Sequence, residues 1–159
     1  MTDPNTDSAL RLLYTDLIGG WNRHNAHAFA AGFAEDGEVV GFDGSQMFGR
    51  AQIQATVAQI FADHVTAPYT VIVRVVKALG PQAALLRAVA GMAPVGAADI
   101  DPALNAIHSL VAVQQGAHWR IALFQNTPAQ FHGRPELVEQ LTAELREKRG
   151  PAVRPAATS

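Results

Sequence analysis

The sequence contains no cysteine among its 159 residues. Without thiols the chain cannot form disulfides, use a thiolate as a nucleophile or bind a metal through sulfur. Charge is also scarce, because 16% of the residues are Asp, Glu, Lys or Arg, whereas about 25% is usual in soluble domains. This low charge, together with 48% hydrophobic residues, predicts that apolar surface is buried between subunits or lines a cavity.

Positive charge is not in excess, since 12 Lys and Arg residues stand against 14 Asp and Glu residues. Such a chain offers no basic surface for phosphates, which argues against nucleic acid as a partner. No apolar run reaches the roughly 18 residues of a membrane span, which argues against a membrane partner. The polar, acidic stretch 1–7 lacks the basic start and apolar centre of a signal peptide. We therefore expect a cytoplasmic protein.

Apolar residues recur at steps of three and four in the first half of the chain, which is typical of helices with one buried face. The first such stretch is residues 10–21, behind a cap at Asp7 or Ser8. Asn25 predicts the cap of a second, short helix that continues through Ala34. The other predicted elements of this half are a strand at 38–42, a turn at Asp43-Gly44 and, after Gly49-Arg50, a third amphipathic helix that includes 53–64.

β-branched residues are frequent in the second half, and turns rich in Gly and Pro divide it. The predicted strands are residues 69–79, 83–92, 104–114 and 118–126. Strands that follow one another through short turns favour antiparallel pairing. Pro135, followed by leucines four residues apart, predicts a C-terminal helix. The predicted fold class is α+β, with a flexible tail at 1–6, one domain over 7–148 and a disordered tail at 149–159.

Both faces of the predicted strand 69–79 are apolar. Val71, Val73 and Val75 point to one face, and Ile72 and Val76 point to the other. The helices can cover only one face of such a sheet. We expect a second copy of the chain to cover the other face, so a homodimer is predicted.

Three passages give the chain a resemblance to a known family. They are residues 21–36, which begin Trp21-Asn22-Arg23-His24-Asn25; residues 48–53, Phe48-Gly49-Arg50-Ala51-Gln52-Ile53; and residues 105–136, which include Asn105-Ala106-Ile107-His108-Ser109 and Phe124-Gln125-Asn126-Thr127-Pro128. They resemble the SgcJ/EcaC group of the nuclear-transport-factor-2-like superfamily. That superfamily also includes ketosteroid isomerases and SnoaL-like polyketide cyclases. The resemblance extends over about 10–146.

The resemblance implies a cone, in which N-terminal helices wrap a curved antiparallel sheet and a C-terminal helix follows. It also implies a dimer, a role in biosynthesis and a small apolar or polycyclic ligand. Members of the group carry the name oxidoreductase, but this chain has no GxGxxG or Walker-type loop, so no cofactor is predicted. No metal is predicted either, because His24 and His27 have no acidic partner at a metal-binding spacing.

Asp43 is the first candidate catalytic residue, as a general base. In ketosteroid isomerases a carboxylate base lies on the strand after the second helix, and that position aligns here with Gly41, two residues before Asp43. A carboxylate beside an apolar pocket would have a raised pKa that suits proton transfer. The alternative is a turn aspartate that accepts a backbone hydrogen bond, because Asp-Gly is a common turn pair.

His108 is the second candidate catalytic residue, on an otherwise apolar strand. Its same-face neighbours Ala106, Leu110 and Ala112 are mostly small, which leaves room for a ligand that exchanges a proton with the imidazole. Alternatively, the histidine lies at a dimer face or is satisfied in the core. The sequence leaves open whether His108 or Ser109 points inward.

Five more residues are candidates for ligand binding: Trp21, Phe33, Arg87, Gln125 and Asn126. Trp21 and Phe33 would form apolar walls. Arg87 would either anchor an acidic or carbonyl-bearing ligand or form an ion pair at the sheet rim or between subunits. The amides of Gln125 and Asn126 would either bind a ligand's carbonyl and hydroxyl groups or fix the loop that follows.

The sequence leaves two main functions open. The first is a cofactor-independent acid–base enzyme of small-molecule metabolism, an isomerase, cyclase or hydratase. The second is a non-catalytic ligand-binding or carrier module with the same pocket. Two or more ionisable groups within mutual reach in the cavity would favour the enzyme, and one or none would favour the binding module. A third function, a purely structural dimerisation domain, would require a cavity filled by side chains.

Overall fold

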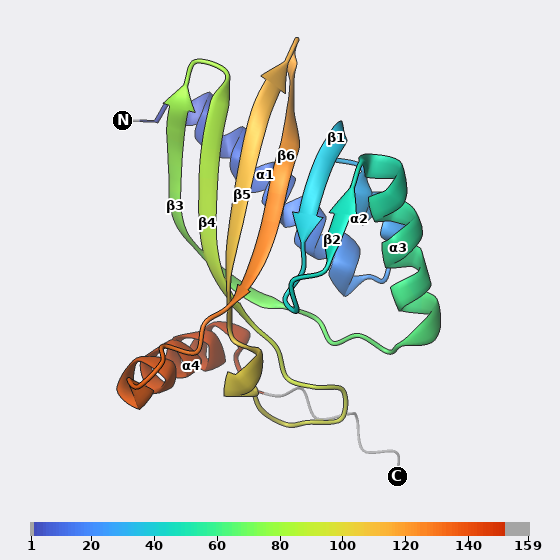
Figure 1. Cartoon of the computed structure of the whole chain (residues 1–159). Helices are drawn as coiled ribbons and strands as arrows, with labels where there is room; N and C mark the ends of the chain where they lie inside the picture. Colours follow the sequence, from blue (N-terminus) through green and yellow to red (C-terminus); the bar gives the residue numbers. More distant parts are fainter. Residues whose placement is uncertain (1, 152–159) are drawn as a thin grey trace.

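One curved sheet and four α-helices make up the fold. The structure is a computed structural model that describes residues 2–151. In chain order the elements are α1 (Pro4–Asn22), α2 (Ala26–Ala30), β1 (Phe33–Val40), β2 (Gln46–Phe48), α3 (Arg50–Asp63), β3 (Thr70–Gly80), β4 (Ala83–Gly91), the short 3-10 helix η1 (Pro102–Leu104), β5 (Ala106–Gln115), β6 (His118–Pro128) and α4 (Pro135–Arg149). Figure 1 shows α1 crossing behind the sheet, α3 beside β1 and β2, and α4 at the foot of the sheet. The predicted α+β fold is confirmed. No helix within residues 2–151 is long and apolar enough to cross a membrane.

The six strands pair in the order β2-β1-β6-β5-β4-β3. The four long strands of the second half form the predicted antiparallel meander. β1 pairs in parallel with β6, and the three-residue strand β2, which the sequence analysis missed, pairs antiparallel with β1. β1 thus covers the edge of β6, whose backbone groups would otherwise be unpaired.

Helix α1 begins one turn earlier than predicted. Its N-cap is Asp3, whose side chain accepts a hydrogen bond from the backbone N–H of Asn5, and Pro4 occupies the first helical position. This arrangement is a good helix start, because proline needs no hydrogen-bond acceptor there. Asp7, one of the two predicted caps, lies inside the helix and pairs with Arg11 at 2.8 Å. The predicted C-terminal tail, 149–159, overlaps the end of α4 at Arg149, and its residues 152–159 lie outside the described residues.

Helix α2 is shorter than predicted, and Phe33 begins a strand instead of ending a helix. The side chain of Asn25 caps α2 as expected, at 3.0 Å from the backbone nitrogen of Ala28. The four-residue spacing of Phe29 and Phe33 imitates a helix face, and their ring centroids do lie 6.1 Å apart. The chain turns after Ala30 because β1 pairs with β6 from Phe33 onward.

The inner face of the sheet packs against α1 and forms the main core. Ala84, Ala88 and Ala112 on β4 and β5 have no exposed surface. Their short side chains leave room for the large buried side chains of α1: Leu10, Tyr14 and Leu17. Beside β1 and β6 the same face is covered by α2 and α3 instead, through contacts of residues such as Phe29 and Val57.

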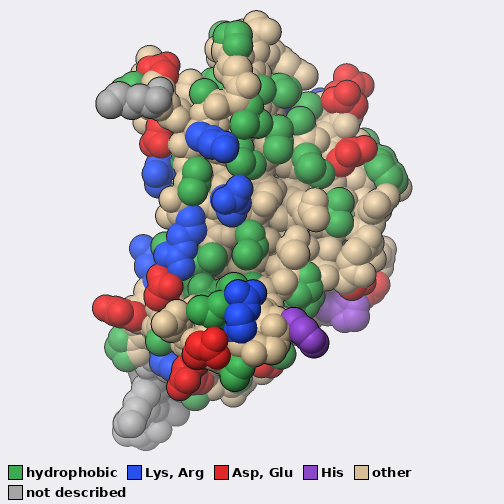
Figure 2. Space-filling view, turned by 60° about the vertical axis from the view of Figure 1, so that its left-hand side comes forward, with side chains coloured by type: hydrophobic (Ala, Val, Ile, Leu, Met, Phe, Trp, Pro, Cys, Tyr) green, Lys and Arg blue, Asp and Glu red, His purple; other side chains and the backbone are tan. Residues whose placement is uncertain are grey.

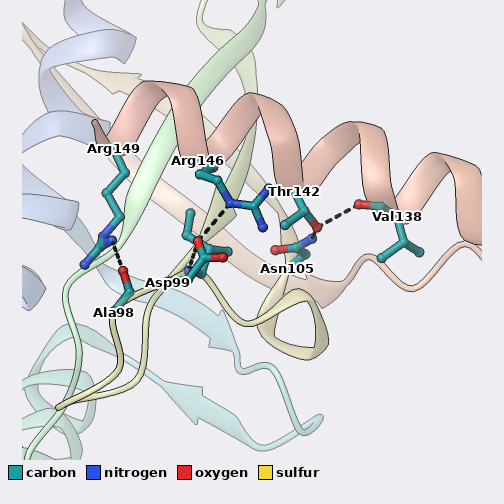
Figure 3. A network of polar contacts seen from close by, with 8 residues as sticks. Ala98, Asp99, Asn105, Val138, Thr142, Arg146 and Arg149 are labelled. Carbon is teal, nitrogen blue, oxygen red and sulfur yellow. Dashed lines mark hydrogen bonds and ion pairs between the residues drawn. The ribbon is translucent and has the colours of Figure 1, made fainter. Parts of the chain in front are cut away.

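Helix α4 covers one end of the outer face and holds the long loop between β4 and β5. Its residue Leu145 is fully buried in a second, smaller apolar cluster with Val89. Figure 3 shows the polar contacts of this helix. Arg146 Nε lies 2.9 Å from Asp99, Arg149 donates to the carbonyl of Ala98, and Asn105 donates to the hydroxyl of Thr142 at 2.9 Å.

The rest of the outer face carries two rows of residues that cross all six strands. The first row is Lys77, Leu85, Val111, Leu123, Glu38 and Phe48, and the second is Val75, Arg87, Ser109, Gln125, Val40 and Gln46. Figure 2 shows hydrophobic side chains between a mixed group of basic and acidic side chains on the left and acidic ones at the upper right. Phe48 keeps 57% of its surface exposed. The outer face therefore combines apolar residues with the basic residues Lys77 and Arg87 on β3 and β4 and the acidic residue Glu38 on β1.

We expect this outer face to be the interface of the predicted homodimer. A two-fold axis along β5 would place Leu85 and Leu123 of the two copies against each other, and Lys77 of one copy against Glu38 of the other. Val111→Asp should then shift the protein from dimer to monomer in light scattering coupled to gel filtration, because it buries an unpaired charge in the interface. Val65→Asp, at a residue that is 78% exposed on the loop after α3, is the control.

Exchanging the charges of Glu38 and Lys77 tests the predicted contact between them. Glu38→Lys should weaken the dimer through like-charge contact, and Glu38→Lys combined with Lys77→Glu should restore it. A wild-type protein that is monomeric at micromolar concentration would contradict the prediction.

Candidate functional site

The inner face of the sheet leaves a cavity of about 360 Å³ between β1, β6 and the first three helices. Its walls are mainly apolar, with Ile18 from α1, Phe29 from α2, Val39 from β1, Val57 from α3 and Phe124 from β6. The turn 41–45 contributes the exposed part of the lining. This size and composition match ordinary small-molecule sites, which are concave and mostly apolar with few polar groups.

Trp21 forms one wall of the cavity, as predicted for an apolar lining residue. Its indole Nε1 donates to the carbonyl of Ala67 at 3.1 Å, and its ring lies edge-on to Phe61 with centroids 5.3 Å apart. These contacts fix the ring in one orientation. Phe33 does not line the cavity; it is fully buried in the core next to Phe29.

Asp43 lies in the lining turn and is exposed to solvent. Its Oδ1 accepts a hydrogen bond from the backbone N–H of Ser45 at 2.9 Å. This bond lowers the pKa of the Asp43 carboxyl below its usual value. The geometry is that of the turn aspartate described above as the alternative, and at the same time it places the carboxylate beside the cavity.

His108 points inward and is fully buried. Its Nδ1 lies 2.8 Å from the hydroxyl of Tyr14 on α1, and its Nε2 has no hydrogen-bond partner within the described residues. Burial lowers the pKa of His108 to about 3, and the nearby amide of Asn126 partly opposes this shift. The imidazole is therefore neutral at neutral pH and does not line the cavity itself.

The hydrogen bond to Tyr14 selects one tautomer of His108. If the Tyr14 hydroxyl donates to Nδ1, the ring proton is on Nε2 and that N–H alone is left unpaired. If Nδ1 donates instead, both the Tyr14 proton and the Nε2 lone pair are left unpaired. Buried polar atoms without partners are costly, so the first arrangement is favoured.

Tyr69 and Asn126 supply the polar groups at the β6 side of the lining, whereas Asp43, Ser45 and Thr56 lie elsewhere in it. The Nδ2 of Asn126 donates to the hydroxyl of Tyr69 at 3.1 Å, and the Oδ1 of Asn126 has no partner within the described residues. The backbone of Tyr69 is held by both ends of the Asn22 amide, at 2.8 and 3.1 Å. Burial raises the pKa of Tyr69, so its hydroxyl is a stable hydrogen-bond donor at neutral pH.

Arg87 and Gln125 lie away from the cavity. Both are exposed on the outer face, in the same cross-strand row on either side of Ser109. The prediction that they bind a ligand in the cone thus has no support from their placement, and only Trp21, Asn126 and Asp43 of the candidate set reach the lining. Within residues 2–151 no three His, Asp or Glu side chains lie close enough to hold a metal ion.

Two residues of the site, Tyr14 and Tyr69, were not singled out from the sequence. Tyr14 belongs to the apolar stripe of α1 and was interpreted only as a core residue. Tyr69 opens the strand after Pro68 and resembles any aromatic residue at a strand start. A signal that could have drawn attention to both is their identity as the only two tyrosines of the chain, since buried tyrosines usually bring a hydrogen-bond partner.

Solved structures show what the chain is similar to, whereas no known protein family and no curated protein matches its sequence. A domain of unknown function with a cystatin-like fold from Nostoc punctiforme superposes with a TM-score of 0.78 and 25% identity, over 87% of this chain and 86% of that one. A ketosteroid isomerase-like protein from Erwinia carotovora atroseptica has a TM-score of 0.64 at 12% identity, over 81% and 99% of the two chains. An NTF-2 like protein of unknown function from Shewanella oneidensis has a TM-score of 0.59 at 15% identity, over 76% and 98%.

These similarities establish the fold. The chain has the cystatin-like cone that the resemblance to the nuclear-transport-factor-2-like superfamily implied. Identities of this size do not carry an activity or a ligand from one chain to another, because the same fold hosts different functions.

The buried, neutral state of His108 predicts a pH dependence of stability. The pKa of an unfolded histidine is about 6.5, so the unfolded chain takes up a proton as the pH falls below that value while the folded chain does not. The contribution of His108 to the free energy of unfolding should therefore have its full value above pH 6.5. The free energy of unfolding should fall by about 2 kcal/mol when the pH is lowered from 7.5 to 5. Denaturant titrations at the two pH values measure this difference.

The variant His108→Gln should show a smaller difference between the two pH values, whatever its absolute stability. His118→Gln, at an exposed histidine of β6, should keep the full difference. Equal pH dependence in the wild type and His108→Gln would show that His108 is not the group responsible.

Proposed function

We propose that the protein binds a small, uncharged and mainly apolar molecule in the cavity between β1, β6 and helices α1–α3. The observation that carries this proposal is the cavity of about 360 Å³ with almost entirely apolar walls. An open apolar space of this size gives up contacts that a filled core would make. A purely structural dimerisation domain would gain stability by filling it, so the cavity favours a ligand.

The walls of the cavity are held in place before any ligand arrives. Trp21 is fixed by its bond to Ala67 and by the neighbouring rings of Phe61 and Tyr69. Tyr69 is fixed by the two hydrogen bonds to Asn22. A preformed site loses little conformational entropy on binding, which favours affinity for a rigid ring compound.

A second candidate function, the acid–base enzyme, is supported by the position of Asp43 at the cavity. Two properties make its carboxylate a weak base: it is exposed, and the Ser45 hydrogen bond lowers its pKa. The low pKa of His108 likewise leaves that imidazole neutral and weakly basic. The lining thus offers one carboxylate, Asp43, besides neutral hydroxyl and amide side chains, which supports binding better than catalysis.

Membership in the SgcJ/EcaC group, a role in biosynthesis and a cytoplasmic location are also part of this proposal. The support for the group is the set of three sequence passages given above, and the third passage contains the polar residues His108 and Asn126.

Filling the cavity should abolish binding. The uncharged dye N-phenyl-1-naphthylamine becomes fluorescent in apolar surroundings, and we expect the wild type to bind it with a saturable signal. Ile60→Trp places a larger ring at a half-buried position of the lining and should weaken the affinity at least about 10-fold, which corresponds to about 1.4 kcal/mol. Leu12→Trp adds the same ring at a position of α1 that is 61% exposed and should leave binding unchanged. Absence of saturable binding to the wild type would remove the basis of the proposed function.

The enzyme candidate makes a separate prediction, which a generic substrate can test. 5-Nitrobenzisoxazole opens to a coloured phenolate when a base removes one proton, so it reports a carboxylate that faces an apolar cavity. If Asp43 is such a base, Asp43→Asn should lower the rate by a factor of roughly 100 or more, whereas Asp36→Asn, at an exposed residue outside the lining, should not. Equal rates for the wild type and Asp43→Asn would exclude Asp43 as a base toward this substrate.

A further inference from the structure

Four polar side chains form a row that leads from helix α1 to the cavity. The hydroxyl of Tyr14 lies 2.8 Å from His108 Nδ1, and the Nδ2 of Asn126 donates to the hydroxyl of Tyr69 at 3.1 Å. His108 and Asn126 connect the two pairs, because they are cross-strand partners in the β5–β6 register. Tyr14 and His108 are buried in the core, whereas Asn126 and Tyr69 belong to the cavity lining. The row thus begins in the core and ends at the cavity.

The middle of the row brings together two buried atoms that have no other partner. His108 Nε2 and Asn126 Oδ1 are both fully buried and have no hydrogen-bond partner elsewhere in the described residues. The amide of Asn126 acts on the imidazole, since it opposes the lowering of the His108 pKa. A ring N–H and an amide oxygen are complementary, so each atom meets the need of the other when Asn126 Oδ1 faces His108 Nε2–H. No free acceptor is then left on this wall.

The direction of the row follows from the buried hydroxyl of Tyr14. If every bond were reversed, His108 Nδ1 would donate to Tyr14, and the Tyr14 proton would be left in the core without an acceptor among the described residues. With Tyr14 as the donor, the only proton without an acceptor is that of the Tyr69 hydroxyl, at the cavity. An unpaired donor is costly in a closed core, so the second direction is favoured. The NH₂ group of Asn126 faces Tyr69, which agrees with this direction.

We propose that the ligand carries a hydrogen-bond acceptor, such as a carbonyl oxygen, that takes the proton of the Tyr69 hydroxyl, and that His108 is a positioning residue that directs this proton to the cavity through Asn126. This inference rests on the proposed function and names the class of ligand for the same cavity. A hydrocarbon would leave the Tyr69 proton unpaired. An alcohol could accept this proton, but its own proton would find no acceptor on this wall.

The acceptor should be uncharged. Asp43 is the acidic residue of the lining, and no Lys, Arg or His of the described residues lines the cavity. A carboxylate would therefore meet a single donor, Tyr69, and burial of a charge among apolar walls with so little compensation is strongly unfavourable. These properties favour a carbonyl oxygen at the polar end of an otherwise apolar molecule.

Two ligands of nearly the same shape test the contact with Tyr69. They are 2-acetylnaphthalene and 2-isopropenylnaphthalene, in which a CH₂ group replaces the carbonyl oxygen. Their dissociation constants are measured by displacement of N-phenyl-1-naphthylamine. The ratio of the hydrocarbon constant to the ketone constant should fall at least about 5-fold from the wild type to Tyr69→Phe, which removes a single oxygen atom. Thr56→Val removes a different hydroxyl of the lining and should keep the wild-type ratio. An equal ratio in the wild type and Tyr69→Phe would overturn the inference.

The infrared band of the ligand carbonyl tests the positioning role of His108. We expect the carbonyl stretch of bound 2-acetylnaphthalene, labelled with ¹³C, to lie at lower frequency in the wild type than in hexane, and this shift should be lost in Tyr69→Phe. His108→Phe leaves Tyr69 in place but removes both ring nitrogens, and it should also lose part of the shift. Tyr14→Phe removes the donor at the start of the row and should act in the same way. A wild-type shift in both His108→Phe and Tyr14→Phe would refute the positioning role.

The same measurements distinguish failure of the inference from failure of the proposed function. If both naphthalenes displace the dye but the ratio does not depend on Tyr69, the cavity binds apolar molecules and only the acceptor preference is refuted. If neither compound displaces the dye from the wild type, both are refuted.

Discussion

The fold depends above all on the contact between helix α1 and the inner face of the sheet. This face is covered by α1 where the alanines of β4 and β5 make room for its large side chains. A hydrogen bond of 2.8 Å between the Tyr14 hydroxyl and His108 Nδ1 connects the helix to the centre of the sheet. Because one helix is too narrow to cover a curved six-stranded sheet, the part beside β1 and β6 is left to α2 and α3. The cavity lies in that part, so its position follows from the limits of helix–sheet packing.

The sequence predicts the architecture better than the site. Apolar residues at steps of three and four located α3 and α4, and turn residues located the four long strands of the meander. The helix–strand junction at 30–33 was wrong, because the four-residue spacing of Phe29 and Phe33 has the same appearance in a helix and across a tight turn. The strand β2 was missed because three residues are too few for an alternating pattern to be visible.

The main difficulty in predicting the site from the sequence was to determine which face of the sheet each strand residue points to. Four irregularities interrupt the pairing of the strands, among them one between Val73 and Val75 on β3 and one between Val111 and Ala112 in the β5–β6 pairing. A sequence carries no clear sign of such bulges, and each one exchanges the faces of all residues beyond it. For this reason the sequence made Gln125 and Asn126 equally good candidates for ligand binding, although their side chains point to opposite faces. Tyr14 could not be linked to His108 either, since the two are 94 positions apart.

The alternation along β6 also joins two features that would otherwise be independent. Gln125 belongs to the outer row and Asn126 to the cavity wall, so two adjacent residues of β6 contribute to the outer surface and to the cavity. A substitution can alter one side without the other, but an insertion or deletion of one residue cannot. Such a change would exchange the two faces of the strand beyond it at once. Evolution of this chain toward another ligand should therefore proceed through point substitutions in β6, with length changes confined to the turn 41–45 and to the loop between β4 and β5.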